Sequence, residues 1–275
     1  EEAVEQGPQL SLEQASLGVV AAGGRRALGP AGPMPPPAMT PLPPGRITLR
    51  DARRGTTRDV KLKPFEIAIH PLHGPDTGLP VAPLTWFDAA ALCNALSATE
   101  GLQPAYAHAA DRRSITWDPA ADGYRVPTEA EWEYACRAGT TAPTYGALED
   151  VAWTSLDDLQ GPQPVGQKKA NPWGLHDMLG NVWEWCWDYA DPARYGDYRS
   201  LRGGGWADEP WSVRASVRRG SAPDAVLEDV GLRLARGLVG SPGQAQGWSH
   251  EADRQRAAIC GPLPVGWTPL REIFA

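Results

Sequence analysis

The chain has 275 residues, and its 33 Asp and Glu outnumber 26 Lys and Arg, which gives a net charge of −7. An acidic chain without a basic stripe argues against nucleic acid as the main partner. No apolar run reaches the length of a membrane span, and the first residues show no charged-then-apolar signal, so neither a span nor a targeting segment is predicted.

The length fits one domain with extensions at both ends better than two full domains. The 30 Gly and 28 Pro predict a loop-rich domain, and 12 Trp supply its core. Four cysteines are widely spread without paired spacing, which predicts buried thiols rather than a disulfide framework. The sequence does not determine the cellular compartment, but the lack of a disulfide framework favours the cytoplasm.

Residues 1–45 are expected to form a Pro-rich N-terminal extension. Residues 10–22 have the pattern of a short helix with Ser11 as its N-cap. Eight Pro between residues 30 and 44 exclude a helix and favour polyproline II. We interpret this arm as a solvated linker, with packing along the domain surface as the alternative.

Residues 46–236 are expected to form the domain. Its elements, in chain order, are a hairpin formed by residues 46–60 and the following KPFEIAIHPL, a helix over 85–100, a short β-excursion over 104–123, and a helix that begins near 128. Thr85 is placed to cap the first helix, and Thr128 with Glu131 has the spacing of a capping box. Two helices around short, irregular β-sheets predict an α+β domain.

The most informative stretch is Asn171 to Trp187, NPWGLHDMLGNVWEWCW. Its last three tryptophans alternate with Glu184 and Cys186, which is the period of a strand with one face buried. Three indoles on one face bury a large apolar area, and each N–H then needs an acceptor. Such a strand is expected to anchor the fold.

This stretch resembles the formylglycine-generating enzyme (sulfatase-modifying factor) family, a branch of the C-type-lectin-like fold. Four more stretches match the family in the same order: PVAPLTWFDAAALCNALS, YRVPTEAEWEYACRAGT, RGGGW and GLRLAR. The resemblance covers roughly residues 60 to 236. It implies a C-type-lectin-like fold of the formylglycine-generating-enzyme type.

Enzymes of this family bind copper through two cysteines shortly after the turn that is RGGGW here. The matching positions lie near Asp208 and Val213, and no Cys occurs between Cys186 and Cys260. Cu(I) needs thiolate ligands, so the chain is expected not to be an enzyme, and no catalytic residue is assigned. The alternatives are a divergent oxidoreductase of the sulfatase-modifying type, or a structural or regulatory accessory domain.

The resemblance also implies a calcium site in the DMLGNVWEW segment. Its ligands would be the side chains of Asp177 and Glu184 and the backbone carbonyls of Gly180 and Val182. Hard oxygen ligands of this kind suit Ca²⁺. In the alternative, the two carboxylates accept hydrogen bonds from buried donors without a metal, and no cofactor is required.

The spacing from RGGGW to GLRLAR is also similar to that in variable proteins of diversity-generating retroelements, which display a hypervariable ligand-binding face on this fold. The resemblance implies a face within residues 207–229, with side chains directed to solvent. The candidate ligand-binding positions are Ala207, Asp208, Glu209, Ser212, Val213, Val217, Arg219, Gly220, Ser221, Ala222, Ala225, Leu227, Glu228 and Asp229.

The leading prediction is therefore a non-catalytic ligand-binding protein whose ligand is a protein or another macromolecule. Residues 237–275 are expected to be a C-terminal extension. Their apolar residues are scattered, so this extension is predicted only to dock on the domain or on a neighbouring subunit.

Overall fold

The computed structural model describes residues 34–52, 55–108, 114–241, 244–249 and 251–253. The chain divides after Pro35, and the unit that begins at Pro36 carries every helix and strand of the described residues. The helix predicted over residues 10–22 lies outside them, as does the first part of the Pro-rich stretch.

The regular elements are short. The strands are β1 (Met39–Leu42), β2 (Gly45–Asp51), β3 (Thr56–Leu62), β4 (Phe65–Ala68), β5 (Tyr106–His108), β6 (Ile115–Trp117), β7 (Trp183–Tyr189), β8 (Arg199–Arg202), β9 (Arg218–Ser221), β10 (Val230–Gly231), β11 (Ala235–Arg236), β12 (Gly240–Ser241), β13 (Gln244–Ala245) and β14 (Trp248–Ser249). The helices are α1 (Trp86–Thr99), α2 (Glu129–Arg137), α3 (Leu148–Val151) and α4 (Pro192–Tyr195), with a 3₁₀ turn η2 (Ser155–Asp157).

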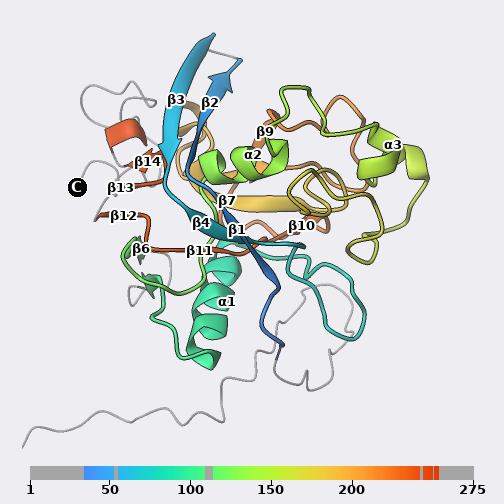
Figure 1. Cartoon of the computed structure of the whole chain (residues 1–275). Coiled ribbons are helices and arrows are strands. Elements are labelled where there is room, and N and C mark those ends of the chain that lie inside the picture. The colour runs from blue at the N-terminus through green and yellow to red at the C-terminus, as the bar shows by residue number, and fades with distance from the viewer. Residues whose placement is uncertain (1–33, 53–54, 109–113, 242–243, 250, 254–275) are drawn as a thin grey trace, which may run out of the picture. The chain divides into compact units, whose positions relative to one another are not determined.

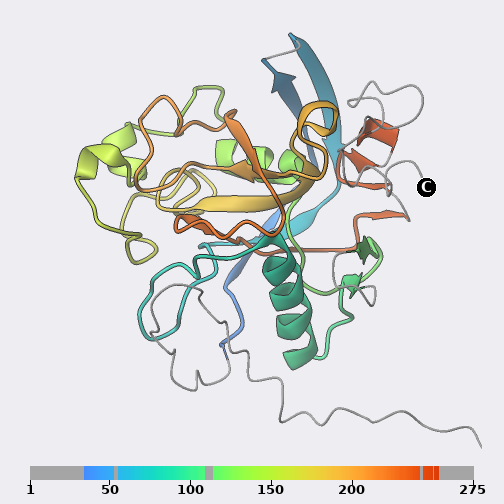
Figure 2. The same cartoon turned by 180° about the vertical axis from the view of Figure 1, so that it is seen from behind.

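The central sheet has the strand order β10-β7-β8-β9, and a second sheet has the order β1-β4-β11. β2 and β3 form a separate hairpin that packs against α2 and whose far end extends past it, and α1 and α2 lie on opposite sides of β7 (Figure 1). The view from behind shows the same arrangement (Figure 2). The predicted fold class, α+β with two helices around short sheets and many loops, is confirmed.

Both predicted helix starts are confirmed. The Thr85 hydroxyl accepts from the Asp88 backbone N–H at 3.0 Å, and the Asp88 carboxylate accepts from the Thr85 N–H in return. Thr128 and Glu131 form the same reciprocal pair at the start of α2. These capping boxes satisfy donors that a helix leaves unpaired in its first turn.

The strand predicted from the alternating tryptophans is β7, but the expectation of one buried face is wrong. All seven of its residues are buried. On the tryptophan face, Trp185 donates its indole N–H to the Leu84 carbonyl at 2.8 Å. On the opposite face, the Glu184 carboxylate accepts the Trp132 indole N–H from α2 at 2.6 Å. Helix α2 covers the side that the alternation assigned to solvent.

Both predicted domain boundaries differ from the structure. Strand β1 pairs with β4 from Met39↔Ala68 to Leu42↔Phe65, so the domain begins before residue 46. At the other end, the Gln246 carbonyl accepts from the Thr128 hydroxyl at 2.8 Å, and Trp248 is buried. The described part of the expected C-terminal extension therefore belongs to the domain.

Within the described residues, no helix combines the length and the apolar character that a membrane crossing requires.

We expect Trp185→Ala to lower the free energy of unfolding by about 3–5 kcal/mol, because a fully buried indole is replaced by a cavity and the Leu84 carbonyl loses its donor. Trp211→Ala is the matched control, since that side chain is 64% exposed and should change stability by only about 0.5 kcal/mol. Urea unfolding of both variants tests the pair, and equal losses would contradict the assignment of the core.

Candidate functional site

The segment from residue 207 to 229 connects the glycine-rich turn after β8 to the short strand β10. Its middle forms β9, which pairs antiparallel with β8 from Arg199↔Ser221 to Arg202↔Arg218. β10 in turn pairs with β7 at Trp183. The segment is therefore held at its centre and at its end by the central sheet.

The turn before the segment requires glycine. Gly204 has φ +87°, and a Cβ placed on it would lie 2.8 Å from a methyl group of Val213. A Cβ on Gly205 would lie 2.5 Å from the Asp229 carboxylate. Both the beginning and the end of the segment thus pack directly against the turn backbone, which only glycine permits.

Asp208 anchors the segment from inside. Its carboxylate accepts the indole N–H of Trp183 at 2.6 Å and the backbone N–H of Gly205 at 2.8 Å, and it pairs with Arg219 at 2.9 Å. Arg219 also donates to the Ser212 hydroxyl at 2.9 Å and lies over the Trp183 ring. Two candidate ligand-binding residues are thereby tied to the core strand β7.

The candidate positions divide by exposure. Ala207, Glu209, Arg219, Leu227 and Glu228 are exposed. Val217, Gly220, Ser221, Ala222, Ala225 and Asp229 are intermediate. The expectation of a solvent-facing side chain is wrong at Asp208, Ser212 and Val213, which are buried. Asp208 and Ser212 point inward to hydrogen-bond partners, and Val213 fills the space over Gly204.

The structure adds exposed apolar side chains that the sequence comparison passed over. Trp211 is 64% and Val226 59% exposed. Leu156, which is 74% exposed, comes from another loop, where the Ser155 N–H donates to the Asp208 carbonyl at 3.0 Å. A tryptophan within a run of small and polar residues was the available signal for Trp211. The prediction that the tryptophans supply the core is therefore wrong at Trp211.

The positions that match the family's copper-binding cysteines offer no soft ligand. Asp208 is held by nitrogen donors, and Val213 is fully buried. Cys93, Cys136 and Cys186 are buried free thiols, and burial raises the pKa of each well above its usual range. In the described part of the chain, no group of three or more His, Cys, Asp or Glu is arranged to hold a metal ion.

Two of the four residues expected to bind calcium, Asp177 and Glu184, contact the buried guanidinium of Arg233. The Glu184 carboxylate accepts three contacts from Arg233, at 2.8 to 3.0 Å, and one from Trp132 at 2.6 Å. An ionised carboxylate has about four lone-pair sites, so all of them are engaged. Asp177 accepts the Gly166 N–H at 2.7 Å. Glu184 therefore does not fit calcium coordination in this arrangement.

Three histidines from two segments cluster beside this network. The His70 ring lies 5.1 Å from the His176 ring and 5.7 Å from the His73 ring, measured between centroids. Burial, followed by the charges of His176 and Arg233, lowers the pKa of His70 to about 4. His70 is therefore uncharged at neutral pH, which lets the rings pack closely.

Comparison with known proteins identifies the family. Residues 73–238 match the sulfatase-modifying factor enzyme 1-like domain. This match covers more than half of the chain, so the chain belongs to that family. It is 32% identical over 194 residues to the chaperone protein LppX of Paenibacillus barcinonensis, a match that covers 57% of this chain and 69% of LppX.

Of two other relatives, one is named as an inactive enzyme and one as an oxygenase. The chain is 32% identical to the inactive C-alpha-formylglycine-generating enzyme 2 of Bos taurus, across 44% of this chain and 47% of that protein. It is 35% identical to hercynine oxygenase of Mycolicibacterium smegmatis, across 41% and 33%. The chain thus spans half or less of these two relatives.

Among solved structures, Treponema denticola variable protein 1 superimposes with a TM-score of 0.64 at 27% identity. The superposition covers 72% of this chain and 94% of that protein. This similarity confirms the predicted C-type-lectin-like fold of the formylglycine-generating-enzyme type.

We expect Asp208→Ala to destabilise the protein by about 1–3 kcal/mol, because two buried N–H donors lose their acceptor. Glu209→Ala is the control, since the neighbouring carboxylate is exposed. Thermal and urea unfolding of the two variants measures the difference. A neutral Asp208→Ala would show that the segment is not anchored as described.

We expect EDTA to leave the melting temperature unchanged, because Arg233 and Trp132 already engage Glu184. The measurement is thermal unfolding after EDTA treatment, repeated with added CaCl₂ and with added MgCl₂ as control. Stabilisation by Ca²⁺ alone would contradict this expectation and restore the calcium assignment.

Proposed function

We propose that this member of the sulfatase-modifying factor enzyme 1-like domain family is a non-catalytic ligand-binding protein. Its binding face is formed by the exposed parts of residues 207–229, together with Leu156. The observation that carries the proposal is Trp211, a large apolar side chain that is 64% exposed on a segment otherwise anchored to the core. Tryptophan is enriched among the residues that supply most of the binding energy at interfaces, so an exposed tryptophan on an anchored segment supports an interaction site.

The composition of the face suits a macromolecular partner. Binding energy at protein interfaces is concentrated in a few residues, among which Trp and Arg are enriched. Here Trp211 and Arg219 lie in the same segment, with Val226 and Leu227 also exposed. The Asp208 anchor holds the backbone before any ligand arrives, which reduces the entropy lost on binding.

Two observations support a binding role over catalysis. The side chains at the family's copper positions are the buried carboxylate of Asp208 and the buried Val213, neither of which can ligate Cu(I). One curated relative is also named an inactive enzyme. The alternative, a divergent oxidoreductase, draws on relatives such as hercynine oxygenase, of which this chain spans only 33%.

We further propose that the face is diversified, as in the variable proteins of diversity-generating retroelements. The support is the similarity to Treponema denticola variable protein 1 over 94% of that protein. On this proposal, the exposed positions carry the diversity and the buried ones stay constant, because a random residue at Asp208 or Val213 would disrupt the anchor.

Sequencing the coding locus in many isolates tests both parts. We expect codon differences at residues 207, 209, 211 and 226–228, constant codons at 208, 212 and 213, and a nearby non-coding copy that differs mainly at adenines. An invariant locus without such a copy contradicts diversification. Variation spread equally over buried codons contradicts the assignment of the face.

Elemental analysis of the purified protein separates binding from catalysis. The proposal expects no stoichiometric copper or iron. One bound copper or iron per chain that survives dialysis would favour the oxidoreductase instead.

A further inference from the structure

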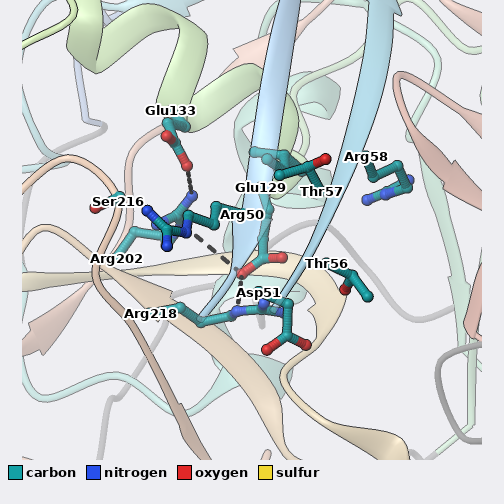
Figure 3. Close-up of a pocket in the computed structure, with 11 residues that line it drawn as sticks. Arg50, Asp51, Thr56, Thr57, Arg58, Glu129, Glu133, Arg202, Ser216 and Arg218 are labelled. Carbon is teal, nitrogen blue, oxygen red and sulfur yellow. Dashed lines mark hydrogen bonds and ion pairs between the residues drawn. The ribbon is translucent and has the colours of Figure 1, made fainter. Parts of the chain in front are cut away.

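A cleft of about 150 Å³ lies between the β2–β3 hairpin, helix α2 and the middle of the 207–229 segment. Figure 3 shows the charged side chains that line it, with Arg202 between Glu133 and Glu129 and Arg218 on the other side of Glu129. The cleft is formed by elements far apart in sequence, so no local sequence motif predicts it.

The floor of the cleft is a buried ionic network. Arg202 pairs closely with Glu133, but its Nε lies 3.7 Å from the nearer oxygen of Glu129, and the Arg218 Nε lies 3.3 Å from the same oxygen. Charge-assisted hydrogen bonds are normally about 2.7–2.9 Å long. The pairs around Glu129 are therefore loose.

This looseness leaves one donor unused. The Arg202 side chain is only 3% exposed, and its Nε has no hydrogen-bond acceptor among the described residues. Leaving a buried donor unpaired costs free energy. An oxyanion that takes the place of the Glu129 carboxylate beside this Nε would recover it.

The rim supplies further donors. Arg50 is exposed, and its side chain forms no hydrogen bond or ion pair with the described residues. In Figure 3 it lies beside Arg202 and Ser216, whose hydroxyl is on the exposed part of the segment. Four arginines line the cleft against three carboxylates, an excess of positive charge on a chain whose net charge is −7.

We propose that this cleft binds an oxyanion group of a ligand, either a carboxylate or a phosphate. Arg50 and Ser216 would donate from the rim, Arg218 from the wall and the Arg202 Nε from the floor. Guanidinium groups match the planar, bidentate geometry of such oxyanions. The cleft adjoins the proposed binding face through Ser216 and Arg218, but the inference rests on its own geometry and not on the proposed function.

The test is an NMR titration of the full chain with succinate and, separately, with inorganic phosphate. We expect saturable shifts of the Ser216 and Arg218 amide signals, and we expect Arg50→Gln to weaken binding about tenfold, since it removes a charge-assisted donor. The Arg50 side chain has no hydrogen-bond or ion-pair partner among the described residues, so this variant should keep its fold. Arg46→Gln is the matched control, because Arg46 is also exposed on β2 but does not line the cleft.

The two probes distinguish a carboxylate from a phosphate ligand. Chemical shifts that do not saturate would overturn the proposal, as would an equal loss of affinity in Arg50→Gln and Arg46→Gln. Either result would mean that the anions are attracted to arginine without a specific site. Saturable binding of methylammonium in place of both anions would overturn it as well. None of these outcomes affects the locus experiment, so failure here leaves the proposed function standing.

Discussion

The structure depends on one buried guanidinium, that of Arg233. It is fully buried and binds the Glu184 carboxylate of the central strand. Its remaining N–H groups donate to the backbone carbonyls of Ala68, Ile69, His176 and Asp177. A single side chain thus joins the second sheet, the loop before β7 and β7 itself. Breaking such a pair leaves an uncompensated buried charge, which is strongly destabilising, so the arrangement of these three segments is fixed together.

The segment proposed as the binding face is anchored to the same strand. Glu184 on one face of β7 holds Arg233, while Trp183, its neighbour, donates to Asp208 on the other side. The loop that carries Trp211 is therefore connected to the buried network through two adjacent residues. A surface of this kind can change its exposed side chains without changing its backbone, because the residues that set the backbone point inward.

The same scaffold occurs in relatives whose names state enzymes and in one whose name states inactivity, and fold alone does not decide between these roles. The decision lies in a few side chains. Where the family's enzymes have two thiolates, this chain has a carboxylate that serves as a structural hydrogen-bond acceptor and a valine that packs against a glycine turn. At these two positions the side chains support the folded conformation of the loop.

The sequence by itself determined both helix starts and the strand at Trp183–Tyr189, because capping boxes and alternating indoles are local patterns whose physical effect does not depend on distant residues. The fold family followed from the resemblance of five stretches of the chain to a known family. It also located the segment of the candidate face. The sequence could not show that Asp208 is buried while Glu209 is exposed. These neighbouring carboxylates differ in whether the indole N–H of Trp183 in β7 is within hydrogen-bond distance. It likewise could not show that Arg233 engages Glu184, that Trp211 faces solvent, or that Arg50 and Arg218 share a cleft. Those facts depend on which segments meet in space, and only the tertiary structure decided them.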